Sequence, residues 1–68
     1  IKFHEKLSSR EFQVMRMLVE GEGIKNIAGR LVLSPKTVST YRSRILQKLD
    51  LQNNTDLVKY AIKNNFTG

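Results

Sequence analysis

Polar and basic side chains are concentrated between Ser34 and Leu49, and they suit binding rather than bond-breaking chemistry. This segment holds several hydroxyl groups and four basic residues but no acidic residue. An enzyme nucleophile needs a partner base, whereas the only histidine, His4, falls in the N-terminal segment. The absence of cysteine excludes a disulfide and a Cys/His zinc site. With no acid/base pair and no phosphate-binding loop, we expect a protein that is not an enzyme and that has no metal and no cofactor.

The positive charge is confined to the middle of the chain. The 68 residues carry 12 Lys and Arg against 6 Asp and Glu, a formal net charge of +6. Residues 23–49 hold six basic and no acidic residues, so the rest of the chain holds six of each and is neutral. A one-sided basic segment attracts a polyanion, and the phosphate backbone of nucleic acid is the commonest one. The alternative is a solvated basic surface without a partner.

Capping signals predict two helices in the first half of the chain. Ser8 and Glu11 form a capping-box pattern, in which the serine hydroxyl and the glutamate carboxylate each accept from the other residue's backbone N–H. Apolar residues follow at helical spacing, and a second helix is expected at about 24–31. The pair Val32-Leu33 is too short for anything but a tight turn before the next helix.

The second half of the chain predicts two more helices. Ser34 is a strong helix cap and Pro35 suits a first helical position, so the third helix is expected from Pro35 to about Leu49. A fourth begins at Asn53 or Asn54, with Asp56 as the capping partner, and extends as far as Phe66. Strand signals are weak throughout. The expected fold class is all-α, a compact four-helix helix-turn-helix domain over residues 7–68, with residues 1–6 as the end of a linker.

The third helix separates into faces when its residues are placed at ~100° each. Ile45 and Leu49 fall within ~20° of Val38 and form the stripe that faces the core. The opposite side, called here the outward face, carries Lys36, Ser39, Thr40, Ser43 and Gln47. Next to the outward face, a strip called here the first flank carries Thr37, Arg44 and Lys48. Tyr41 lies between this flank and the core, where its hydroxyl either donates to a phosphate, which we favour, or stays in water while the ring packs beside Val38. Short hydroxyl side chains allow close approach to base edges, while hydroxyls and cations suit phosphates, so this helix predicts binding in the major groove of double-stranded DNA.

The motifs together resemble one family. The stretches Leu7-Ser8-Ser9-Arg10-Glu11, Ile27-Ala28, Leu33-Ser34-Pro35-Lys36-Thr37-Val38 and Ile45-Leu46-Gln47-Lys48-Leu49 resemble the LuxR-type (GerE/NarL-like) helix-turn-helix domain. The run from Lys36 to Tyr41 is most similar to the branch of two-component response regulators that includes BvgA and EvgA. The resemblance spans about residues 7–66. It implies a transcription factor with phosphate contacts near Lys36-Thr37, base contacts at Ser39, Thr40 and Ser43, and dimerisation through the fourth helix.

Three positions depart from the family pattern. Gly23 and Asn26 replace the capping pair that many members have at the second helix, so we expect its start to be slightly frayed. Val32 stands where many members have glycine, and a valine at positive φ is strained, so we expect a different turn conformation. Gly29 lies inside a helix at a cost of ~1 kcal/mol, and we expect it to allow close helix approach.

Two features of the helices leave alternatives open. Arg42 lies on the core side of its helix, where we expect it to extend its charged end to solvent or to pair with an acid such as Glu11. On the fourth helix, Leu57 and Ala61 form a stripe toward the core, while Val58 and Ile62 form a neighbouring one. Two interpretations are possible: either both stripes belong to the core, or the second stripe forms a two-fold homodimer interface. We favour the homodimer interface because of the family resemblance.

Sequence-specific binding of double-stranded DNA by a transcription regulator is the function expected. The competing hypothesis is a helical module whose basic groove docks an acidic partner helix; steep salt dependence and site preference distinguish DNA binding from it. The chain begins at Ile1 rather than Met, and the resemblance implies an N-terminal receiver domain absent from this chain. No apolar run approaches the ~20 residues that cross a bilayer, so we expect no membrane contact and a cytoplasmic location.

Overall fold

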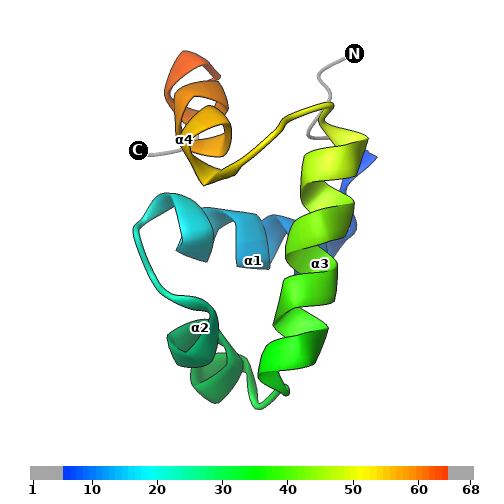
Figure 1. Cartoon of the computed structure of the whole chain (residues 1–68), viewed down its shortest axis with the longest axis vertical. Coiled ribbons are helices and arrows are strands. Elements are labelled where there is room, and N and C mark those ends of the chain that lie inside the picture. The colour runs from blue at the N-terminus through cyan, green and yellow to red at the C-terminus, as the bar shows by residue number, and fades with distance from the viewer. Residues whose placement is uncertain (1–5, 65–68) are drawn as a thin grey trace.

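A computed structural model describes residues 6–64 of the chain, and this part consists of four helices without a strand (Figure 1). The helices are α1 (Ser9–Val19), α2 (Ile24–Leu31), α3 (Pro35–Lys48) and α4 (Asn54–Lys63). The expected all-α class and the four helices are confirmed, but α4 ends at Lys63, with Asn64 as its cap, and so is shorter than the sequence predicts. Phe66 and nearly all of the expected linker lie outside the described residues.

The first helix begins at the capping box that the sequence predicts. The Ser8 hydroxyl accepts from the Glu11 backbone N–H at 3.1 Å, and the Ser8 N–H donates to Glu11 Oε1 at 2.8 Å. The helix ends in a Schellman motif centred on Gly21, whose φ is +91°. There the N–H of Gly21 donates to the Leu18 carbonyl and the N–H of Glu22 donates to the Met17 carbonyl. Local sequence therefore determines both ends of α1.

The turn between α2 and α3 is left-handed at Val32, with φ 56° and ψ 48°. The expectation of a different turn conformation is wrong. The turn keeps the left-handed geometry because the N–H groups of Val32 and Leu33 both donate to the Ala28 carbonyl, which closes α2. The next residue, Ser34, then caps α3 by accepting from the Thr37 N–H at 3.1 Å. A valine is thus held in a region that glycine prefers.

The connection between α3 and α4 also uses a left-handed residue, Asp50 (φ 58°). The side chain of Asn53 caps α4 by accepting from the Asp56 N–H at 2.9 Å, as the sequence predicts. The carboxylate of Asp56, however, accepts from the N–H of Gln52 rather than from that of Asn53. The capping box is therefore present, but its second hydrogen bond comes from the residue before the N-cap instead of from the N-cap itself.

The core lies where α3 packs against α1 and α2. The fourth helix, α4, also packs on α1, at the opposite end of the domain from α2 (Figure 1). Its fully buried side chains come from all four helices: Val14, Met15, Ile27, Val38, Ile45, Leu57 and Ala61. Gly29 does not take part, because it is exposed and a Cβ built there would meet nothing within 4 Å. The expectation that Gly29 allows close helix approach is therefore wrong. None of these four helices is long and apolar enough to cross a membrane.

Candidate nucleic-acid interface

The nine residues predicted to contact DNA all lie on α3, and eight of them are exposed. The buried side of this helix holds Val38, Ile45 and Leu46, which anchor it to the rest of the domain. The exposed residues are those of the outward face and the first flank: Lys36, Thr37, Ser39, Thr40, Ser43, Arg44, Gln47 and Lys48. The ninth, Tyr41, is half-buried and packs against the core. The sequence pattern thus correctly separates the core side of α3 from its solvent side.

Hydrogen bonds at the start of α3 occupy some of the hydroxyl groups. The Ser34 and Thr37 hydroxyl oxygens lie 2.9 Å apart, within the cap of the helix. The Thr40 hydroxyl donates to the Lys36 carbonyl at 3.1 Å, a common arrangement for threonine in helices. With its proton committed to the helix, the Thr40 oxygen offers lone pairs, and its methyl group offers an apolar contact. No carboxylate lies on α3 to repel a phosphate.

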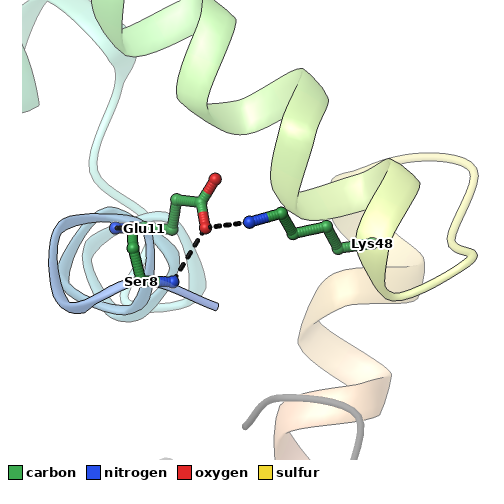
Figure 2. Close-up of polar contacts among 3 residues, drawn as sticks. All are labelled: Ser8, Glu11 and Lys48. Atoms are coloured by element: carbon green, nitrogen blue, oxygen red, sulfur yellow. Dashed lines mark hydrogen bonds and ion pairs between the residues drawn. The ribbon is translucent and has the colours of Figure 1, made fainter. Parts of the chain in front are cut away.

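The end of α3 is tied to the start of α1 by an ion pair between Lys48 and Glu11 (Figure 2). Lys48 Nζ donates to Glu11 Oε1 at 2.7 Å, and the same oxygen accepts from the Ser8 N–H. The Glu11 side chain is only 5% exposed, whereas that of Lys48 is 40% exposed. The carboxylate therefore caps α1 and binds α3 at the same time. The sequence indicates only the first of these roles, because the two residues are 37 positions apart.

The charge of Glu11 depends on these partners. Burial by itself raises the pKa of this carboxyl, but the hydrogen bonds from Lys48 and Ser8 and the positive charge of Lys48 outweigh burial. The pKa of Glu11 is consequently lowered from its ordinary value of 4.5. At neutral pH, the α1–α3 contact is thus a charged pair, and an ammonium group has three donors, of which one is used here.

Arg42 has a different partner from the one that the sequence suggests. Its Nε donates to Asn54 Oδ1 at 2.7 Å, and Asn54 is the first residue of α4. The expected pairing of Arg42 with Glu11 is wrong, since Lys48 occupies that carboxylate. Arg42 lies on the side of α3 that is nearer α4, and this proximity follows from how the two helices pack. No local pattern signals the Arg42–Asn54 contact.

The second apolar stripe of α4 is open to solvent. Leu57 and Ala61 are fully buried, as expected, whereas Val58 is half-buried and Ile62 is 61% exposed. The alternative in which both stripes belong to the core is therefore wrong for Ile62. An exposed isoleucine beside a half-buried valine leaves a small apolar surface on α4.

In this fold a short turn joins α2 to α3, and α3 is basic and has no acidic residue. Comparisons with known proteins agree with this geometry. The model of the family "Bacterial regulatory proteins, luxR family" (GerE) matches residues 5–61. The chain belongs to this family. The LuxR-type resemblance of the sequence is thereby confirmed.

Named relatives of this LuxR-family domain come from several bacteria. It is 46% identical over 59 residues to the "Virulence factors putative positive transcription regulator BvgA" of Bordetella pertussis, covering 87% of this chain and 28% of that protein. It is 42% identical over 57 residues to the "Oxygen regulatory protein NreC" of Staphylococcus haemolyticus (84% and 26%). It is 40% identical over 60 residues to the "DNA-binding transcriptional activator EvgA" of Escherichia coli K12 (88% and 29%). The chain therefore spans less than a third of the length of these curated relatives.

Proposed function

We propose that α3 binds in the major groove of double-stranded DNA and recognises a specific sequence there. One observation carries this proposal: the exposed side of α3 consists of hydroxyl, amide and cationic side chains without a carboxylate. A helix fits the major groove, and small side chains allow its backbone to approach the bases. α1 and α2 pack on the opposite side of α3, and eight residues of this face are exposed; one of them, Lys48, also pairs with Glu11 of α1.

The residues of α3 divide into two roles in this proposal. Ser39, Thr40, Ser43 and Gln47 contact base edges. Because the Thr40 hydroxyl donates to its own helix, it is suited to accept from a base amino group or to contact the methyl group of thymine. The phosphate contacts come from Lys36, Thr37, Tyr41, Arg44 and Lys48. Lys48 retains two donors beyond its bond to Glu11, so the ion pair leaves it able to bind a phosphate.

The proposal extends to the whole protein of which this chain is a part. We infer that residues 7–68 form the output domain of a two-component response regulator, following an N-terminal receiver domain that is absent from this chain. The domain pairs as a homodimer on DNA through Val58 and Ile62 of α4, and the exposure of Ile62 supports this role. A regulator of this kind acts on chromosomal DNA in the cytoplasm and carries out no catalysis.

Selection of bound sites from random duplexes tests the proposal directly. The domain should enrich a defined sequence, and binding to it should weaken steeply as salt is raised. Arg44→Gln should lower the slope of log affinity against log salt by ~1, whereas Arg16→Gln, a change at an exposed arginine on α1, should leave it unchanged. Thr40→Ala and Ser43→Ala should change which bases are enriched. The proposal fails if no duplex is enriched, which is the result expected of a module that docks an acidic helix.

A further inference from the structure

Arg42 is the basic residue of α3 that lies outside both the outward face and the first flank. At ~100° per residue it lies ~40° from Val38, about 160° around the helix from Arg44. It is nevertheless partly exposed, and its Nε reaches Asn54 at the start of α4. A helix in the major groove has a phosphate backbone on each side of it. The guanidinium end of Arg42 lies at the start of α4, on the side of α3 away from Arg44, and is called here the second flank.

The guanidinium of Arg42 is fixed through only one of its donors. Nε donates to Asn54 Oδ1 at 2.7 Å, and Asn54 is held at the start of α4 by the cap that Asn53 provides. None of the hydrogen bonds and ion pairs observed within residues 6–64 uses the two terminal nitrogens of Arg42. By contrast, Arg30 and Lys48 are paired with the carboxylates of Glu22 and Glu11.

This arrangement suits an anion with two acceptor oxygens. A guanidinium binds a phosphate through parallel N–H groups, and holding Nε in place removes part of the entropy that a free arginine loses on binding. A neutral amide partner orients the guanidinium without cancelling its charge, which a carboxylate partner would do. We propose that Arg42 binds a DNA phosphate on the strand opposite the one bound by the first flank, and that Asn54 positions it.

This inference rests on the proposed function, and its test uses the enriched duplex in salt titrations of binding. Arg42→Gln should lower the affinity about tenfold at low salt, and it should lower the slope of log affinity against log salt by ~0.9, the value for one phosphate contact. Asn54→Ala keeps the charge, so it should lower the affinity less and leave the slope unchanged. Arg16→Gln is the matched control, and circular dichroism checks that every variant is folded.

The outcomes separate this inference from the proposed function. If the parent binds the duplex and Arg44→Gln lowers the slope, but folded Arg42→Gln retains the parental slope, the phosphate contact of Arg42 is wrong. If Asn54→Ala retains the parental affinity, the positioning role is wrong. If the parent shows no salt-dependent duplex binding, the proposed function itself fails. Should Arg42→Gln not fold, Arg42→Lys replaces it: weaker binding with an unchanged slope is expected, and parental affinity overturns the inference.

Discussion

Replacing Val32 by glycine should stabilise the domain, because the turn holds this valine in the left-handed region. At φ 56° and ψ 48°, an L-residue loses roughly 1–2 kcal/mol relative to right-handed conformations, and a β-branched side chain lies at the upper end. Glycine removes this strain but loses ~0.5–1 kcal/mol more chain entropy on folding. The Val32 side chain is 90% exposed, so its removal gives up almost no buried apolar surface. The net gain is about 1 kcal/mol, which raises Tm by ~4–8 °C in a domain of this size.

Thermal and urea unfolding followed by circular dichroism measure this gain, and two other substitutions serve as controls. Val32→Ala keeps a Cβ at the left-handed position, so it should recover only part of the gain. Gly21→Ala should destabilise the domain, because φ is +91° there and a new Cβ would meet nothing within 4 Å that offsets the strain. If Val32→Gly leaves Tm unchanged or lowers it while Gly21→Ala behaves as expected, the strain argument for Val32 is refuted.

Three further predictions concern the ion pair and the surface of α4. The folded pKa of Glu11 is below its ordinary 4.5, so the stability that the charged carboxylate contributes is complete above about pH 4.5 and is lost as pH falls through the lower, folded value. In urea unfolding, Glu11→Gln should therefore be less stable than the parent by a constant amount from pH 7 to about 4.5, and the difference should shrink below that; a constant difference down to pH 2 would contradict this. Lys48→Ala should weaken binding to all duplexes and also lower stability by ~1–3 kcal/mol, because the buried carboxylate loses a charged partner; parental stability would show that the pair contributes nothing. Val58→Asp should leave the fold and binding to a single half-site intact but abolish cooperative binding to two half-sites about one DNA turn apart. An unfolded variant would place Val58 in the core, and cooperativity in a folded one would place the dimer contact elsewhere.

The ends of the helices follow from the sequence because their determinants are local. Ser8 with Glu11, Ser34 with Thr37, and Asn53 with Asp56 each cap a helix across three residues, so the chain needs no tertiary contact to specify these starts. The division of α3 into a buried and an exposed side is also local, since helical periodicity dictates which residues share a side. For this reason the sequence predicts the four helices and the outward face of α3. The contact roles of the residues on that face remain predictions.

Tertiary structure decided the features that depend on contacts between distant residues. Lys48 meets Glu11 across 37 positions only because α3 packs on α1, and Arg42 meets Asn54 only because α4 follows a left-handed turn at Asp50. The strained conformation of Val32 opposes the local preference of valine, and the packing of α2 and α3 on either side of the turn maintains it. Periodicity alone also leaves open whether Ile62 is buried, because that depends on which helices cover α4. The sequence thus determines which elements form and which sides they present, whereas packing determines which charges meet.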